Sequence, residues 1–173
     1  MRKRREILDG FSYHITARIN RQEFLFESNE VKEMFMDVLR RAKRKHHFLI
    51  KNFCIMSNHI HFILKPLQGE SLSKIMQWIL GVFAQKYNKI FGLSGHVWSD
   101  RFKSKIIISF KQYINTFIYI ANNPVEAGIV EIAVDFKFSG ISDIQKGYYD
   151  IMGRPPNKVL RKIWGILQNK TNQ

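Results

Sequence analysis

Two histidines separated by one residue, His59 and His61, are the side chains in this sequence that most directly suggest metal chemistry. They begin an apolar run that predicts a strand from His59 to Lys65. Because side chains alternate between the faces of a strand, both imidazoles are expected on the same face. Two neighbouring imidazoles are a common part of a metal site. The same spacing also arises by chance, so two ordinary histidines on a polar face are the alternative.

Tyr119 and Asn123 form a second polar group on a predicted helix from Lys111 to Asn122, which Pro124 is expected to stop. The apolar side of this helix has residues at helical spacing, namely Ile114, Phe117, Ile118 and Ala121. Tyr119 and Asn123 project from the other side and, being four residues apart, are neighbours there. The alternative is a solvated helix face with a surface tyrosine.

The segment from Gly95 to Ser104 combines aromatic and basic residues in a predicted loop. Such a loop can stack a nucleic-acid base on Trp98 and hold a phosphate with its cations. A structural loop with a buried Trp98 is the alternative that the residues leave open.

Hydrophobic periodicity predicts the elements that must position these groups. The expected strands are 11–19, 48–56, 59–65 and 103–110, and the expected helices are 28–42, 71–87, 111–122 and one near 156–169. Ser57 and Asn58 form the turn of a hairpin between the second and third strands. This order predicts an α+β single domain, with helices packed on an antiparallel sheet in the ferredoxin-like (split βαβ) arrangement. The segment 131–153 is expected to be loose.

The C-terminal helix has an apolar face that requires a partner. Its members are Val159, Leu160, Ile163, Trp164 and Leu167. We expect this face to pack on its own domain or on a second protomer, because the sequence does not choose between a monomer and a homodimer.

Charge limits the class of partner. Among 173 residues, 28 are Lys or Arg and 14 are Asp or Glu, which gives a net charge of +14. A surface this basic attracts polyanions, with nucleic acid as the leading partner and anionic membrane as the second. No apolar run is long enough to span a bilayer, and no helix combines a basic face with an apolar face beyond the needs of the core, so no membrane partner is expected.

Cysteine content and the N-terminus bear on the compartment. Cys54 is the sole cysteine, so an internal disulfide is excluded, which fits a reducing cytosol. The basic residues 1–10 have no apolar stretch behind them and are not expected to be a secretory signal. We expect a cytoplasmic protein that associates with nucleic acid.

Four separated motifs resemble those of the single-tyrosine HUH transposases, most closely the REP-associated members. They are Met56–Pro66 (MSNHIHFILKP), Tyr13–Arg18, Gly95–Trp98 with Arg101–Ser104, and Tyr119–Ile120 with Asn123–Val130. The resemblance covers residues 11–140 in order and spacing. One departure is Phe138-Ser139-Gly140, where the family often has Trp-Ser-Ser. We therefore expect a transposase domain over 1–140 and an extension over 141–173.

The resemblance implies a nucleophile at Tyr119 and a metal site formed by His59, His61 and Asn123. It implies a divalent cation, Mg²⁺ or Mn²⁺, of which nitrogen ligands favour Mn²⁺. The reaction would cut and rejoin single-stranded or hairpin DNA through a 5′-phosphotyrosine. The expected DNA contacts are Arg18, Arg40, Arg41, Lys43, Arg44, Lys45, Trp98, Arg101, Lys103 and Lys105.

Other proteins with HUH chemistry fit the sequence less well. In relaxases the tyrosine precedes the histidines, whereas Tyr119 follows them here. Replication initiators usually carry additional domains. A non-catalytic DNA-hairpin-binding protein that kept the fold remains the alternative from another functional class.

Overall fold

A computed structural model describes residue 8, residues 10–20 and residues 23–171. Most of the N-terminal segment considered as a signal therefore lies outside the described residues. The elements are β1 (Ser12–Arg18), α1 (Asn29–Lys45), β2 (Phe48–Ile55), β3 (His59–Pro66), α2 (Leu72–Phe91), β4 (Lys103–Ile107), α3 (Phe110–Glu126), the 3₁₀ turn η2 (Ala133–Asp135), α4 (Gly140–Lys146) and α5 (Asn157–Thr171).

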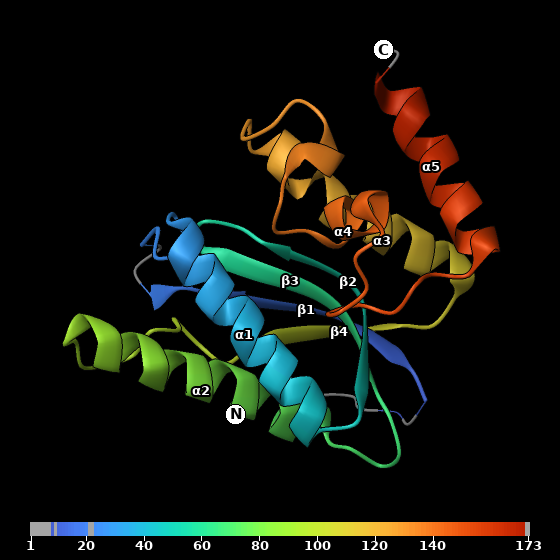
Figure 1. Ribbon diagram of the computed structural model, residues 1–173. Helices are drawn as coiled ribbons and strands as arrows, with labels where there is room; N and C mark the ends of the chain where they lie inside the picture. The colour runs from blue at the N-terminus through green and yellow to red at the C-terminus, as the bar shows by residue number, and fades with distance from the viewer. Residues whose placement is uncertain (1–7, 9, 21–22, 172–173) are drawn as a thin grey trace.

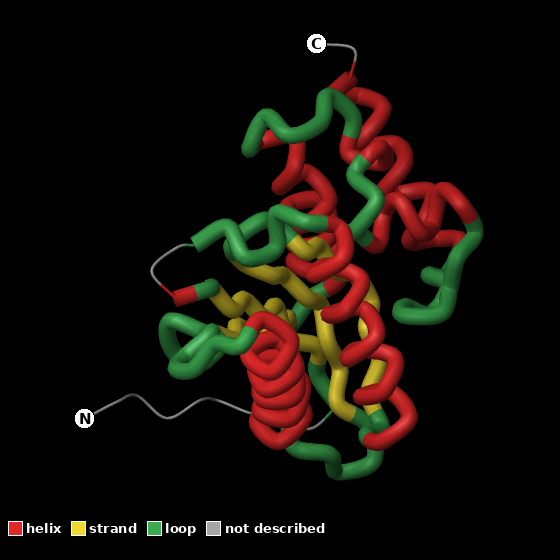
Figure 2. The backbone as a smooth tube through the Cα atoms, turned by 60° about the vertical axis from the view of Figure 1, so that its left-hand side comes forward, coloured by secondary structure: helices red, strands yellow, loops and turns green. Residues whose placement is uncertain are grey.

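The four strands form one antiparallel sheet in the order β2-β3-β1-β4. This is the strand order of a split βαβ fold, which confirms the predicted arrangement. Helices α1 and α2 cover one face of the sheet, and α3, α4 and α5 gather on the other (Figure 1). Figure 2 shows the strands between these two groups of helices.

Alternation along the strands explains why one face became the core. Ile15 on β1 and Phe62 on β3 are register partners, both fully buried on the face covered by α1 and α2. The ring of Phe62 stacks on Phe35 of α1 at 6.3 Å. The intervening strand residues point to the opposite face, where α3 lies, and they include the polar residues His14 and Thr16 of β1 and His59 and His61 of β3.

Serine caps fix three of the helix starts. Ser28 and Ser71 accept hydrogen bonds from the first turns of α1 and α2, as the sequence predicts. Ser109 caps α3 in the same way, by accepting from the Gln112 N–H at 3.1 Å. This unforeseen cap ends β4 at Ile107, so the predicted strand to Phe110 was too long.

The expectation that Pro124 stops the tyrosine helix was wrong. Helix α3 continues through Pro124 to Glu126, and the Ala127 N–H donates to the Asn123 carbonyl at 3.0 Å. Proline removes one backbone donor, and the helix tolerates this loss near its end. As a result Asn123 stays in helical geometry, one turn beyond Tyr119.

The segment 131–153, expected to be loose, contains η2 and α4 and is packed against the sheet. The Ile55 N–H donates to the Phe138 carbonyl at 3.0 Å, which ties this segment to β2. Ile141 and Met152 are fully buried. Gly140 lies so close to Asn52 of β2 that a Cβ there would collide with the Asn52 side chain.

The C-terminal helix α5 packs on its own domain, as one of the two expectations proposed. It contacts α3, with Ile163 fully buried and Val159 nearly so. Trp164 and Leu167 are partly buried against the same core. Among the described residues, no helix is both long enough and apolar enough to cross a bilayer.

Candidate active site beneath the tyrosine helix

The polar face of the sheet brings together the residues that the sequence singled out. On paired strands β1 and β3, Arg18 is opposite His59 and Thr16 is opposite His61. Helix α3 crosses this face and places Tyr119 beside His61, with ring centroids 5.6 Å apart and the planes perpendicular. The predicted nucleophile and the predicted metal ligands therefore meet in one place.

The two predicted metal-binding imidazoles are neighbours, as the strand alternation requires. The rings of His59 and His61 lie 4.9 Å apart at an angle of 85°. His59 Nδ1 lies 2.7 Å from Asn58 Oδ1, and since an amide oxygen can only accept, Nδ1 donates. In the neutral ring the free lone pair of His59 is then on Nε2.

A third histidine, His14 of β1, belongs to this site although the sequence reading did not single it out. Its Nε2 lies 3.0 Å from His61 Nδ1, and Thr16 Oγ1 lies 3.3 Å from the same atom. The His14 ring also packs edge-on to Tyr119 at 5.7 Å. The signal that could have found it is the alternation of β1, which puts His14 and Thr16 on one polar face.

Burial and neighbouring positive charge keep these imidazoles neutral. Burial is the main cause that lowers the pKa of His61 to about 3, with further lowering by His59, His14 and Arg18. Burial followed by Arg18 lowers the pKa of His59. Burial followed by Lys105 lowers the pKa of His14. Neutral imidazoles retain a lone pair, which a metal ligand requires.

Asn123 completes the group from one turn along α3. Its Nδ2 donates to the Tyr119 carbonyl at 2.8 Å, so the amide oxygen is the atom left to face the site. The Asn123 side chain also acts on His59, whose pKa it raises against the larger lowering by burial and Arg18. Within the described residues no three His, Cys, Asp or Glu side chains gather in a metal-binding arrangement. A cation at this site would therefore depend on two imidazoles and the Asn123 amide oxygen.

Tyr119 is the most accessible member of the group. Its side chain is 45% exposed, whereas His61 is 4% exposed. The ring is held edge-on between His14 and His61. Tyr119 is therefore accessible from solvent, while His14 and His61 contact its ring.

Three predicted DNA contacts, Arg18, Lys103 and Lys105, lie on this face. Lys103 and Lys105 of β4 are exposed and pair in register with Thr16 and His14, so they point to the same side of the sheet as the histidines. Arg18 is exposed beside His59. Arg101 is exposed in the loop that precedes β4.

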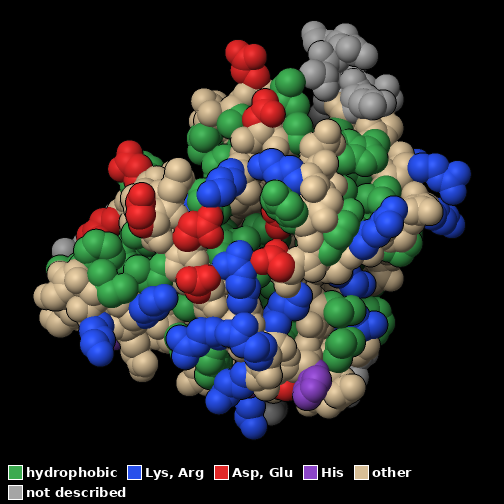
Figure 3. All heavy atoms as spheres, in the orientation of Figure 1, with side chains coloured by type: hydrophobic (Ala, Val, Ile, Leu, Met, Phe, Trp, Pro, Cys, Tyr) green, Lys and Arg blue, Asp and Glu red, His purple; other side chains and the backbone are tan. Residues whose placement is uncertain are grey.

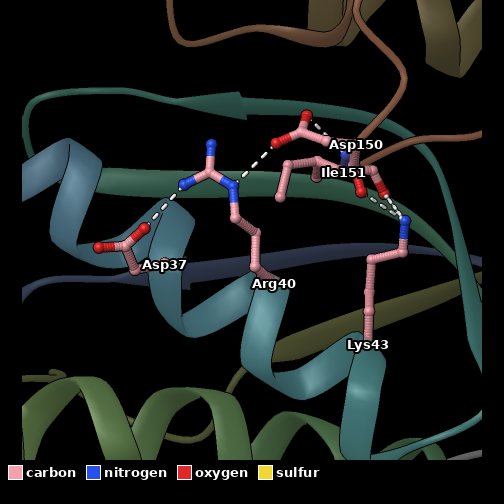
Figure 4. Close-up of polar contacts among 5 residues, drawn as sticks. All are labelled: Asp37, Arg40, Lys43, Asp150 and Ile151. Atoms are coloured by element: carbon pink, nitrogen blue, oxygen red, sulfur yellow. Dashed lines mark hydrogen bonds and ion pairs between the residues drawn. The ribbon is translucent and has the colours of Figure 1, made fainter.

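The predicted contacts on α1 are not brought to this site, because α1 covers the opposite face of the sheet. Arg40 donates to Asp37 and Asp150, each at 2.8 Å, and Lys43 donates to the carbonyls of Asp150 and Ile151 (Figure 4). These bonds fasten α1 to the segment after α4.

The other predicted DNA contacts on α1 are Arg41, Arg44 and Lys45, all exposed. Arg41 and Lys45 lie over the ring of Trp78 at 5.9 and 5.8 Å. Figure 3 shows Lys and Arg side chains gathered on the side of the molecule where α1 lies. This basic surface is separate from Tyr119.

Trp98 is a structural residue of its loop, which was the alternative to stacking on a nucleic-acid base. Its ring packs with Phe26, Phe35 and Phe83 at 5.7 to 6.1 Å. Its Nε1–H donates to the Leu80 carbonyl at 2.9 Å. The indole therefore anchors the loop to the core on the side of α1 and α2, away from Tyr119.

Comparison with known proteins finds a family model and similar solved structures. The family model described as "Transposase IS200 like" matches residues 8–123. The solved structure of the REP-associated tyrosine transposase bound to a REP hairpin is 25% identical with a TM-score of 0.72, over 90% of this chain and 92% of that chain. A candidate transposase from Deinococcus radiodurans R1 is 19% identical with a TM-score of 0.48, over 70% of this chain and 97% of that chain. No curated protein matches.

The family match spans β1 to Asn123, so it includes the three histidines, the tyrosine and the amide described above. The chain belongs to the IS200-like transposase family.

Proposed function

We propose that this protein cuts and rejoins single-stranded or hairpin DNA through a covalent bond between Tyr119 and a 5′ phosphate. The observation that carries the proposal is the position of Tyr119, half-exposed and packed edge-on to His61 at 5.6 Å, with His59 and Asn123 adjoining. The related structure, whose partner is a REP hairpin, supports hairpin DNA as the substrate class.

In this reaction the scissile phosphate is transferred from the 3′ oxygen of the DNA strand to Tyr119. The Tyr119 hydroxyl oxygen attacks the scissile phosphorus, a new O–P bond forms, and the bond from phosphorus to the 3′ oxygen breaks. The phenol loses one proton and the departing 3′ oxygen gains one. Because the phosphotyrosine keeps the phosphodiester energy, attack by a 3′-OH can rejoin the strand without ATP.

The residues present fit a divalent cation. His59 and His61 are neutral, and each has its Nδ1 engaged by a neighbour, which leaves Nε2 for coordination. The Asn123 amide oxygen provides a third donor. Mg²⁺ or Mn²⁺ held there would polarise the scissile phosphate as a Lewis acid, and the nitrogen donors favour Mn²⁺.

A strand-labelling experiment tests the proposal. Hairpin DNA from the flanks of the gene is incubated with the protein and Mn²⁺, and the products are separated on a denaturing gel. A 3′-end label should move with the protein, whereas a 5′-end label should appear on a shorter free strand. A 5′ label on the protein would contradict the proposed polarity. Hairpin binding without any adduct would favour the non-catalytic binder.

A further inference from the structure

A pocket of about 410 Å³ opens beside Tyr119, between β4 and the N-terminal half of α3. Its lining includes Lys105, Ser109, Lys111, Asn115, Thr116 and Tyr119. None of the described residues that line it is Asp or Glu. The pocket is therefore basic, and the proposed nucleophile Tyr119 forms part of its lining.

Its two cations are available for a ligand. Lys105 comes from the sheet and Lys111 from the helix, so they approach the pocket from different elements. Both are exposed, and neither forms an ion pair with any residue in the described part of the chain. Lys105 pairs in register with His14 of β1, and both side chains line the pocket.

The helix start adds to this positive potential. The pocket lies at the N-terminal turn of the 17-residue α3, where the helix dipole favours anions. No acidic residue occupies that turn. The wall is also held in place, because the Gln112 side chain accepts from the Ile108 N–H at 2.9 Å and donates to the Ile106 carbonyl at 3.1 Å.

The pocket and the candidate metal ligands flank Tyr119 on opposite sides along α3. Asn123 lies one turn after Tyr119, whereas Thr116, Asn115 and Lys111 precede it by one to about two turns. A strand whose scissile phosphate faces Tyr119 and His59 would extend toward this pocket.

We propose that the pocket binds a backbone phosphate of the DNA strand next to the scissile phosphate, with Lys105 and Lys111 as its cationic contacts. This inference rests on the proposed function for the identity of the anion. Binding a neighbouring phosphate would set the register of the strand over Tyr119, since phosphate contacts position a strand without reading its sequence.

The test compares two charge-matched double variants. Lys105→Gln with Lys111→Gln removes the pocket cations, and Lys74→Gln with Lys89→Gln removes two exposed cations from α2 on the other side of the sheet. Affinity for a short fluorescent oligothymidylate is measured as salt is varied. The pocket variant should bind about tenfold more weakly, and its log–log salt slope should be smaller by about 0.7, the contribution of one single-strand phosphate. The α2 variant should match the wild type.

Thermal unfolding of both variants should match the wild type, because all four lysines are exposed. A wild-type slope in the pocket variant would overturn the inference, and so would an equal loss in the α2 variant, which would indicate a diffuse basic surface. Wild-type adduct formation is measured in parallel. If the wild type forms the adduct and the salt slope of the pocket variant is unchanged, the phosphate pocket is contradicted and the proposed function stands. If the salt slope of the pocket variant is smaller but the wild type forms no adduct, strand cleavage is contradicted and the anion pocket stands.

Discussion

His14 connects the two halves of the candidate site at the residue scale. Its Nε2 lies 3.0 Å from His61 Nδ1, and its ring packs against Tyr119 at 5.7 Å. A metal-binding histidine is commonly oriented by a partner on its other ring nitrogen. His14 and Thr16 occupy that position for His61, so we assign both a positioning role.

Replacement of His14 by Ala should weaken Mn²⁺ binding about 10- to 100-fold, because His61 loses a partner that fixes its ring. His14→Gln retains a polar group that can hydrogen-bond and should recover part of the loss. Calorimetric titration of Mn²⁺ measures both. His96→Ala is the matched control, since His96 is exposed in the loop before β4 and should bind Mn²⁺ like the wild type. Unchanged affinity in His14→Ala would remove the positioning role.

The neutral histidines also predict how stability depends on pH without metal. The pKa of His61 is lowered from 6.5 to about 3, so between these values the unfolded chain binds the extra proton. Stability from this group is therefore complete above pH 6.5 and falls as the pH falls toward 3. Asp143, whose pKa is raised to about 6 mainly by burial, acts in the opposite sense.

Urea unfolding in EDTA, at about pH 8 and about pH 5, measures this dependence. The wild type should lose about 1 to 2 kcal/mol more than His61→Gln over that interval, since one pKa unit corresponds to about 1.4 kcal/mol. Equal losses in the two proteins would show that the imidazole is not held neutral by the fold.

At the scale of elements, the tyrosine helix is fixed to the sheet by Asn52. This buried side chain of β2 donates from Nδ2 to the Phe117 carbonyl at 3.0 Å and accepts from the Phe53 N–H at 2.9 Å. Phe117 precedes Tyr119 by two residues. Gly140, at the start of α4, leaves the space that the Asn52 amide occupies.

Gly140→Ala should lower the free energy of unfolding by about 1 to 3 kcal/mol, because the new methyl group must displace Asn52 or Met152. Gly165→Ala is the control. Gly165 lies in α5, and a methyl group added there would meet open space, so alanine should raise stability by about 0.5 to 1 kcal/mol. Chemical denaturation measures both changes. An unaffected Gly140→Ala would mean that α4 can move away from β2 without cost.

Local patterns in the sequence predicted most of these elements. The alternation of β1 and β3, the caps Ser28 and Ser71, and the Ser57-Asn58 turn are all local signals, and each is confirmed. The prediction that Pro124 ends the helix was wrong, because the preference of proline to end a helix is weak compared with the packing of α3 on the sheet. The Asn52 contact spans 65 residues, so no local pattern indicates it.

At the scale of the whole molecule, the net charge of the sequence is +14, and two groups of its Lys and Arg residues lie on opposite sides of the sheet. Arg18, Lys103, Lys105 and Lys111 lie around Tyr119, whereas the basic cluster of α1 lies across the sheet. Composition predicted a nucleic-acid partner but could not assign these cations to faces, because the face of each residue follows from how the helices pack. Arg40 and Lys43 hold α1 to residues 150–151.

The assignment of Tyr119 as the nucleophile is tested most directly by removing its hydroxyl oxygen. Tyr119→Phe keeps the ring between His14 and His61, so the fold, Mn²⁺ binding and DNA binding should match the wild type. Tyr113→Phe is the control on the same helix, because Tyr113 packs against Phe117 and its burial raises its pKa to about 12. With 3′-end-labelled hairpin DNA on a denaturing gel, we expect a covalent adduct from the wild type and Tyr113→Phe and none from Tyr119→Phe. An adduct that persists in Tyr119→Phe would contradict the account.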